Sequence, residues 1–303
     1  MIIYTGGRTD IVHFYSDWLI KRFKEGYVLV RNPLFPGKVT RYELAPDKVD
    51  AVVLTSRNFA PILDRLSVIA DHYSMYYHYI ITAYGKEMEP GVPSIQESIR
   101  TLIELEQLVG SKRIAWRYDP VFLTDVYTEE KHLKTFERIA KQLTGHVDRC
   151  ILGYLDKYDK VKKRMPELRA LNGENQSRFL CELGRIAADY KIPIQACAAR
   201  GDYSRYGITP AGCLTLDMIG EANGLMFKNL KHKGNRPGCQ NIESRDIGAY
   251  HTCLNGCKYC ADQQNPKKVQ ENCELHDPES PLLVGYLRPG DTVQQGIQKS
   301  FRQ

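Results

Sequence analysis

The stretch Arg113-Ile-Ala-Trp-Arg-Tyr118 is a short run of mainly apolar residues, and Glu129–Leu143 follows it after a polar turn. Within Glu129–Leu143 apolar residues recur every three or four positions, as they do in an amphipathic helix. Thr128 stands directly before this stretch, where a side-chain oxygen can cap the first turn. A short apolar run followed by such a helix predicts one βα unit.

The first 225 residues repeat this unit. A helical pattern follows each apolar run, and Tyr27–Arg31 with Lys38–Leu44 has the pattern of a hairpin inserted after the first unit. Parallel strands need connections of this length, so the repeat predicts a parallel sheet in a protein of the α/β class. The apolar runs of the six units are Ile2–Thr5, Val49–Thr55, Tyr77–Ala83, Arg113–Tyr118, Arg149–Tyr154 and Ile192–Cys197.

Six parallel units suit two architectures, a partial (β/α)6 barrel of the TIM type and an open doubly wound sheet. We expect the partial barrel, formed by residues 1–225. The repeat ends at Gly224, and we expect residues 226–303 to be a cysteine-rich segment and a tail that pack on the barrel. In both architectures functional residues gather at the carboxyl ends of the strands.

The composition of the chain narrows its class. The sequence contains no stretch of about 18 apolar residues of the kind that spans a membrane. The N-terminus also lacks the pattern of a secretory signal, so we expect a cytoplasmic protein with reduced thiols. None of its nine cysteines precedes Cys150, and five lie between Cys239 and Cys273. Thiols clustered in this way indicate a metal site rather than disulfides. The net charge of +6 permits an anionic partner without requiring one.

The cysteine cluster centres on Cys253-Leu-Asn-Gly-Cys257-Lys-Tyr-Cys260, and Gly256 allows the loop to turn tightly. Three thiolates on one short loop can hold three irons of a [4Fe–4S] cluster and leave the fourth iron without a protein ligand. An open position is what catalytic metal sites keep. The alternative is a closed zinc site completed by His251 or Cys273, but zinc sites more often use paired Cys-x2-Cys knuckles, and only one such pair occurs here.

This motif resembles the cluster motif of radical S-adenosylmethionine (SAM) enzymes. The resemblance implies that the open iron chelates SAM, and that one electron from the cluster yields a 5′-deoxyadenosyl radical, which abstracts hydrogen from a substrate. It also implies a low-potential electron donor as a partner. Tyr259 occupies the position of the aromatic residue that packs near the adenine in those enzymes.

Over its full length the sequence resembles the domain-of-unknown-function family 1848. The resemblance rests on Arg236–Cys239, Ser244–Tyr250 and the cysteine motif, together with Gly7–Asp10 and Trp116–Pro120. The family has no established activity that the resemblance could imply for this chain. Its cysteine cluster is similar to that of spore photoproduct lyase. Three further cysteines fall on motif positions of the family, which implies a second metal site, Fe–S or zinc, on Cys197, Cys213 and Cys239.

Radical SAM barrels usually carry the cluster loop after their first strand, whereas here a strand at Asp246–Tyr250 and its loop follow six βα units. The resemblance therefore implies a circularly permuted chain, in which Ile2–Thr5 takes the position of the second strand. Permutation is tolerated when the chain termini lie close together. The expected active face combines Asp10, Arg117 and Asp119 as catalytic residues with Gly6, Gly7, Arg57 and Tyr259 as cofactor-binding residues.

Three functions remain open on this evidence. The first is a radical SAM-type enzyme that acts on an unidentified substrate. The second is a nucleic-acid repair or modification protein, which the basic stretches around Lys160 and Lys231 favour weakly. The third is a non-enzymatic Fe–S or zinc protein used for electron transfer, sensing or nucleic-acid binding.

Overall fold

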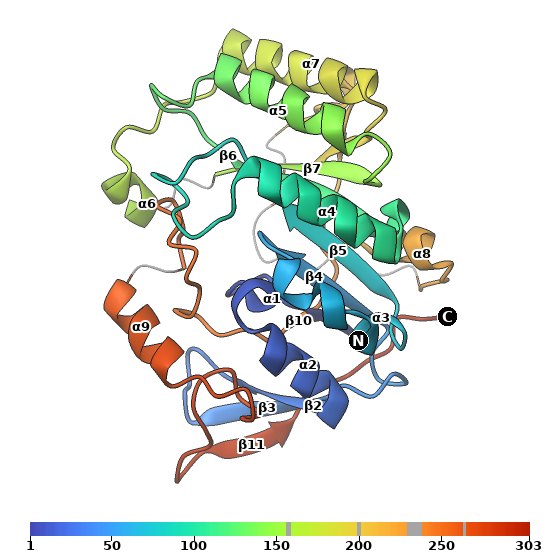
Figure 1. Cartoon of the computed structure of the whole chain (residues 1–303), viewed down its shortest axis with the longest axis vertical. Coiled ribbons are helices and arrows are strands. Elements are labelled where there is room, and N and C mark those ends of the chain that lie inside the picture. The colour runs from blue at the N-terminus through green and yellow to red at the C-terminus, as the bar shows by residue number, and fades with distance from the viewer. Residues whose placement is uncertain (156–158, 199–200, 229–237, 263–264) are drawn as a thin grey trace.

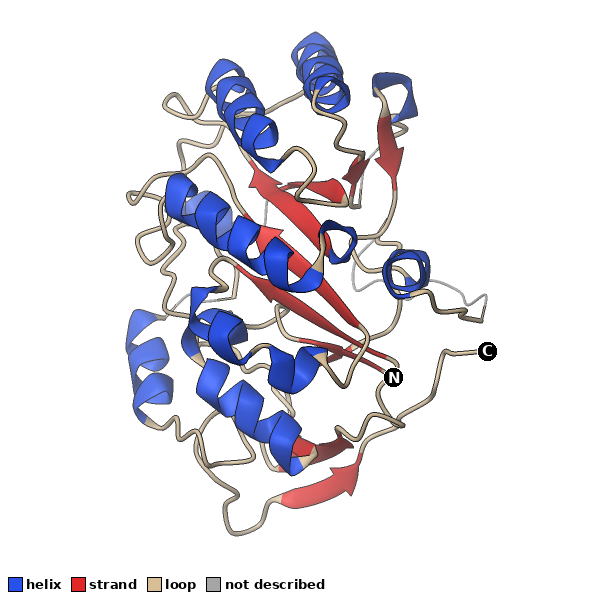
Figure 2. Cartoon of the chain, turned by 45° about the vertical axis from the view of Figure 1, so that its right-hand side comes forward, coloured by secondary structure: helices blue, strands red, loops and turns tan. Residues whose placement is uncertain are grey.

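The computed structural model describes residues 1–155, 159–198, 201–228, 238–262 and 265–303. Its central feature in these residues is an eight-stranded sheet whose strands are all parallel (Figures 1 and 2). In spatial order the strands are β10 (Arg245–Asp246), β1 (Ile2–Tyr4), β4 (Ala51–Ser56), β5 (Met75–Ile80), β6 (Ile114–Val121), β7 (Arg149–Tyr154), β8 (Ile194–Ala196) and β9 (Ile208–Pro210).

Helices cover both faces of this sheet, because alternate side chains of each strand point to opposite faces. One face packs against α2, α4, α5 and α7, and the other packs against α8 (Figure 2). The helices are α1 (Ile11–Phe14), α2 (Ser16–Glu25), α3 (Ser67–Ala70), α4 (Ile95–Val109), α5 (Glu129–Leu143), α6 (Asp159–Arg164), α7 (Gly173–Asp189), α8 (Leu216–Asn223) and α9 (Pro266–Glu274), with short 3-10 turns η1 (Ala60–Arg65), η2 (Ser111–Arg113) and η3 (Ser204–Tyr206).

A second, smaller sheet has the order β11-β3-β2. The strands β2 (Tyr27–Arg31) and β3 (Lys38–Glu43) are antiparallel, which confirms the predicted hairpin. The strand β11 (Thr292–Gln295) comes from the tail and pairs with β3 in parallel.

The structure confirms the α/β class and the parallel sheet, and each predicted apolar run overlaps a strand. The predicted cap is also present, since Thr128 accepts a hydrogen bond from the Lys131 N–H. In addition, Ser94 forms a capping box with Glu97 at the start of α4. The sheet is open in the described residues, with β10 and β9 at its two edges, so no closed barrel is found there. The partial TIM-type barrel remains a prediction.

The segment before the cysteine motif joins the large sheet through β10, which pairs in parallel with β1. This strand has two residues and ends at Asp246, which is the first residue of the predicted strand Asp246–Tyr250. Its pairing places the cysteine loop beside the chain that follows β1. Because β10 and β11 pair with strands from the N-terminal part, residues 226–303 join both sheets. A domain boundary at residue 225 stays a prediction.

Candidate functional site

A pocket of about 170 Å³ lies at the carboxyl ends of β1 and β4 and against the cysteine loop. Four segments that are far apart in the sequence line it, namely the turn after β1, the end of β4, Ile80 at the end of β5 and the loop after β10. The structure thus brings eight predicted residues together in one place. They are Gly6, Gly7, Asp10, Arg57, Cys253, Cys257, Tyr259 and Cys260.

The cysteine loop is held by main-chain hydrogen bonds to the segment after β5. The Gly91 N–H donates to the Asn255 carbonyl at 2.9 Å, and the Lys258 N–H donates to the Met88 carbonyl at 2.9 Å. Within the loop, Gly256 has a φ of +64°, a left-handed conformation that favours glycine. Residues 85–92 therefore fix the position of the loop, a role that the sequence analysis missed.

The thiols of the loop lie in an apolar environment. Burial raises the pKa of Cys253 to about 12 and that of Cys257 to about 11, while Arg57 opposes the shift at Cys257. Burial thus disfavours the thiolate form of both cysteines, and a bound metal cation would oppose this effect because cysteines bind metals as thiolates.

The three thiols of the cysteine loop are the candidate ligands of a metal cluster. Among the described residues, no three His, Cys, Asp or Glu side chains stand in a metal-binding arrangement, so the thiols have to turn toward a common centre. All three cysteines nevertheless line one pocket, and three thiols with one shared opening fit an Fe–S cluster. Neither His251 nor Cys273 lines this pocket, and Cys273 instead lies 3.1 Å from the Tyr15 hydroxyl.

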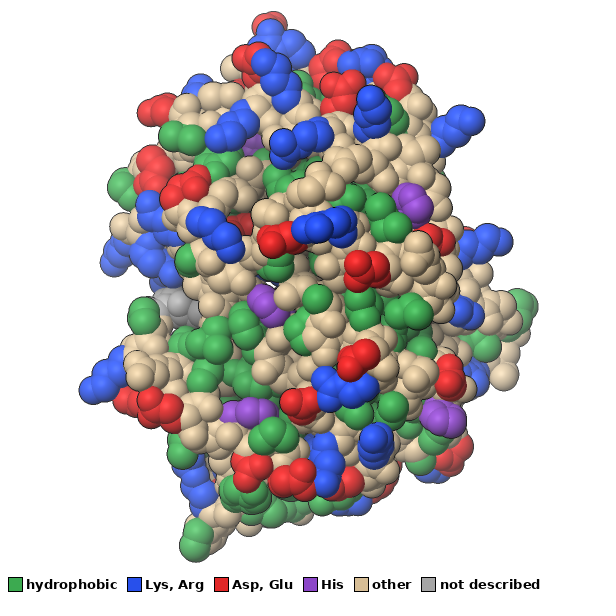
Figure 3. All heavy atoms as spheres, viewed as in Figure 1, with side chains coloured by type: hydrophobic (Ala, Val, Ile, Leu, Met, Phe, Trp, Pro, Cys, Tyr) green, Lys and Arg blue, Asp and Glu red, His purple; other side chains and the backbone are tan. Residues whose placement is uncertain are grey.

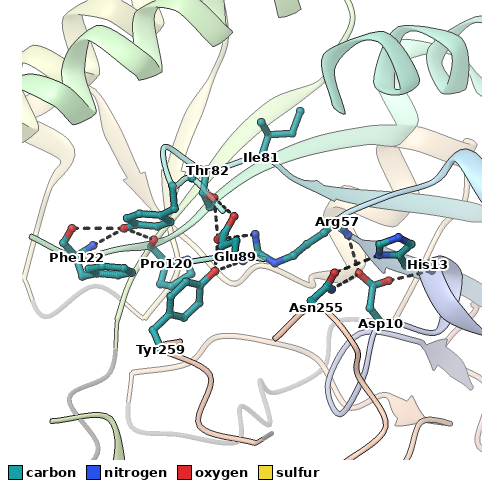
Figure 4. A network of polar contacts seen from close by, with 12 residues as sticks. Asp10, His13, Arg57, Ile81, Thr82, Glu89, Pro120, Phe122, Asn255 and Tyr259 are labelled. Carbon is teal, nitrogen blue, oxygen red and sulfur yellow. Dashed lines mark hydrogen bonds and ion pairs between the residues drawn. The ribbon is translucent and has the colours of Figure 1, made fainter. Parts of the chain in front are cut away.

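Asp10 anchors the loop to the ends of β1 and β4. Its carboxylate accepts hydrogen bonds from the Asn255 side-chain amide at 3.1 Å, the Arg57 N–H at 3.0 Å and the Ser56 hydroxyl at 2.6 Å. It also caps α1 by accepting from the His13 N–H at 3.2 Å (Figure 4). With four donors around it, Asp10 is suited to positioning the loop, whereas we had predicted a catalytic role for it.

A buried ion pair between Arg57 and Glu89 lies beside the pocket, which Arg57 itself lines (Figure 4). The Arg57 guanidinium donates to Glu89 at 2.9 Å and to the Tyr259 hydroxyl, which in turn donates to Glu89. The Thr82 hydroxyl lies 2.9 Å from both carboxylate oxygens of Glu89. Arg57 is 8% exposed and Glu89 is 3% exposed. Burial opposes the charge of Arg57, but Glu89 raises its pKa well above the ordinary value.

This network changes what Arg57 and Tyr259 can do. We predicted that Arg57 binds a carboxylate of a cofactor, and in the structure its guanidinium binds the carboxylate of Glu89. The ring of Tyr259 is almost fully buried and packs against Tyr84 and Phe122, with centroid distances of 5.7 and 5.2 Å. Both residues therefore hold the last turn of the cysteine loop against β4 and the segment after β5.

The two glycines after β1 let the main chain approach its neighbours closely. A Cβ atom on Gly6 would lie 2.4 Å from Cβ of Thr55, and one on Gly7 would lie 2.4 Å from a carboxylate oxygen of Asp246. The Gly7 N–H donates to that Asp246 oxygen at 2.6 Å. Larger residues at either position would force the chain away from the pocket.

The other predicted residues lie outside this pocket. Arg117 and Asp119 form an ion pair at the end of β6, with a guanidinium nitrogen of Arg117 3.5 Å from the Tyr4 hydroxyl. Arg117 also acts electrostatically on Cys197 and Cys213. The single active face that we expected is thus two groups of residues, one around the cysteine loop and one around Arg117.

Within the second group the thiols of Cys197 and Cys213 shift each other's pKa. A hydrogen bond with Cys197 lowers the pKa of Cys213 to about 6 and raises that of Cys197, and Arg117 also lowers the pKa of Cys213. The side-chain amide nitrogen of Asn241 lies 3.2 Å from the Cys213 sulfur. Cys239 contributes no hydrogen bond to either thiol among the contacts of the described residues. The second metal site on Cys197, Cys213 and Cys239 remains a prediction.

The basic residues predicted as a nucleic-acid surface are only partly described. Lys160 lies on α6, where basic side chains gather on the face drawn in Figure 3. Lys231 falls outside the described residues. No helix in the described parts of the chain has the length and apolar character that crossing a bilayer requires.

The contact of Gly91 with the loop gives a first test. A Cβ atom at position 91 would lie 2.6 Å from the Leu254 carbonyl oxygen and 2.7 Å from Cα of Asn255, so Gly91→Ala must displace the cysteine loop. We expect metal affinity to fall by about 10- to 100-fold, measured by anaerobic titration with Co²⁺ and its sulfur charge-transfer absorption. Gly37→Ala is the control, because nothing lies within 4 Å of a Cβ atom there. Equal Co²⁺ affinity in both variants would contradict the role of residues 85–92.

Comparison with known proteins shows the family to which the sequence is similar. The chain matches the family model described as Domain of unknown function (DUF1848) over residues 2–261, which includes the whole cysteine loop. No curated protein matches the chain.

Proposed function

The chain belongs to the DUF1848 family, and from this premise we propose that it is a radical SAM-type enzyme with a [4Fe–4S] cluster on Cys253, Cys257 and Cys260. The observation that carries the proposal is that these three cysteines line one pocket with Gly6 and Gly7 from the other end of the chain. When bound, the cluster supplies the single electron needed to cleave SAM into methionine and a 5′-deoxyadenosyl radical.

The residues around the pocket favour an open metal position over a closed one. The three thiols come from one loop, and neither His251 nor Cys273 lines the pocket with them. Gly6 and Gly7 line the pocket together with the thiols, so their main chain borders the space that a small ligand would enter. The Asp10–Asn255 contact and the Arg57–Glu89–Tyr259 network hold the loop in place from two sides.

The strand order supports the proposed permutation. The cysteine loop follows β10, the pair Gly6–Gly7 follows β1, and these two strands are parallel neighbours. This is the relation that a first and a second strand have in a barrel whose cluster loop follows the first strand. An electron donor of low potential and an unidentified hydrogen-donating substrate complete the proposed reaction.

The function is tested by anaerobic reconstitution with iron and sulfide, followed by reduction with dithionite in the presence of SAM. We expect 5′-deoxyadenosine to form, detected by chromatography, and the paramagnetic resonance signal of the reduced cluster to change when SAM is added. An intact cluster that gives neither result would favour the non-enzymatic Fe–S protein. Stoichiometric zinc in place of iron would favour the zinc protein instead.

A further inference from the structure

The second group of polar residues contains a pair of cysteines that neighbouring strands hold together. Cys197 directly follows β8, and Cys213 lies three residues after β9. The Ala211 N–H donates to the Ala196 carbonyl at 3.2 Å, and the Gln195 amide donates to the Gly212 carbonyl at 2.8 Å. These two contacts tie the chain next to each thiol, and both cysteines belong to one buried cluster of side chains.

The groups around this pair suit a negatively charged sulfur. The Leu214 N–H donates to the side-chain oxygen of Asn241 at 3.1 Å, which fixes the orientation of the amide. The amide nitrogen of Asn241 lies 3.2 Å from the Cys213 sulfur, and the amide oxygen lies 3.4 Å from it. The Arg117 guanidinium favours the thiolate form of both cysteines, and Asp119 opposes it. Among the described residues, the buried Nε of Arg117 has no hydrogen-bond partner. A cation and an amide donor stabilise a thiolate, which is the reactive form of cysteine.

The same groups fit a metal ion poorly. A guanidinium beside two thiols repels a metal cation, and no third His, Cys, Asp or Glu of the described residues joins the pair in a metal-binding arrangement. Among the described residues, Cys213 contacts the side-chain amide of Asn241, which is a weak ligand for the soft metals that thiolates bind. The site therefore has the composition of a reactive dithiol.

We propose that Cys197 and Cys213 form a redox-active dithiol that small hydroperoxides oxidise to an intramolecular disulfide. In the first step the Cys213 thiolate attacks the peroxide, the O–O bond breaks, and a sulfenic acid forms while the leaving hydroxide takes up a proton to give water. In the second step the Cys197 sulfur attacks the sulfenic sulfur, the S–S bond forms, and a second water leaves with the thiol proton. The two thiols lose two electrons, and the peroxide gains them.

The surroundings select a small oxidant. Cys197 is 5% exposed and Cys213 is 7% exposed, so a protein thiol or disulfide has little access to either sulfur. A cavity of about 490 Å³ lies beside the pair and is lined by its neighbours Leu214 and Asn241 and by Tyr4. A hydroperoxide is small enough to enter from this side.

The test uses the full-length protein, purified anaerobically and treated with one equivalent of hydrogen peroxide. Trypsin separates the relevant cysteines onto peptides 192–200, 206–228 and 234–245, so mass spectrometry identifies each linkage. We expect peptides 192–200 and 206–228 to be joined. Cys181, which is exposed on α7, serves as an internal control and should stay reduced under the same treatment.

Two variants assign the steps. In Cys197→Ser the sulfenic acid on Cys213 has no partner and should be trapped by dimedone, whereas Cys213→Ser should lose both the disulfide and the dimedone product. A disulfide to Cys239, or oxidation of Cys181 at the same rate as the pair, would overturn the proposal. So would stoichiometric zinc that is lost in Cys213→Ser. None of these results depends on iron or SAM, so failure of the dithiol is distinguishable from failure of the proposed enzyme.

Discussion

Replacing Cys253, Cys257 or Cys260 with Ala is expected to abolish the binding of iron and acid-labile sulfide after anaerobic reconstitution. Each thiol is one of only three protein ligands that the proposed cluster has, and removing one leaves two irons without a ligand. The loss should appear as near-complete disappearance of bound iron and sulfide and of the visible absorption of the cluster. It should be equally large at all three positions, because all three cysteines line the same pocket.

Two other cysteines provide matched controls for this experiment. Cys181→Ala removes an exposed thiol on α7, away from the pocket, and should leave the iron content unchanged. Cys273→Ala removes the thiol that contacts Tyr15 and the Thr252 carbonyl and that would complete a zinc site. Full iron content in the Cys273 variant would support the open position. Iron retained in all three loop variants would refute the cluster, and loss of metal in the Cys273 variant would favour zinc.

The sequence predicted the strands and helices that are long enough to show a period. Glu129–Leu143 and Ile95–Val109 each contain several helical turns of apolar spacing and a capping residue, and both form helices with those bounds. The strands β9 and β10 contain only three and two residues and, unlike the short strands β1 and β8, do not lie in a longer apolar run. A period-2 pattern needs about four to eight residues to be recognised, so these strands depend on tertiary pairing that local sequence does not reveal.

The candidate site was predictable only in part, for a similar reason. The cysteine motif and Gly6–Gly7 are local patterns, and both line the pocket. Glu89 is a long-range feature, since its partner Tyr259 lies 170 positions away in the chain. Its one local signal is the Gly- and Pro-rich stretch 85–93, which is typical of an ordered loop at a strand end.

The division of the predicted active face into two groups follows from strand order. The sheet places β4 and β5 between β1 and β6. Neighbouring strands lie about 4.8 Å apart, so the ends of β1 and β6 are separated by about 14 Å. Asp10 and Arg117 therefore belong to different ends of one row of strand termini. The sequence indicated the βα units. It did not indicate how strongly the sheet curves, which decides whether the ends of distant strands come together.

Glu89→Gln is expected to lower the free energy of unfolding by about 3–5 kcal/mol. Glutamine keeps the shape of the side chain but removes its charge, which leaves Arg57 buried and without a counter-ion. The 8% exposure of Arg57 allows water to compensate little of this loss. Urea unfolding of the metal-free protein, followed by circular dichroism, measures the change without dependence on the cluster.

The control variant and the double variant that should restore stability are both chosen by how deeply the side chains are buried. Glu130→Gln removes one partner of an exposed pair with Lys134, in which both side chains are about three-quarters exposed, and it should leave the stability unchanged. Adding Arg57→Met to the Glu89→Gln variant removes the unpaired charge and should restore part of the lost stability, because an apolar side chain tolerates this burial. If Glu89→Gln were as stable as the original protein, the ion pair would not carry the loop. If the double variant were the less stable of the two, Arg57 would stabilise the site through contacts other than its charge.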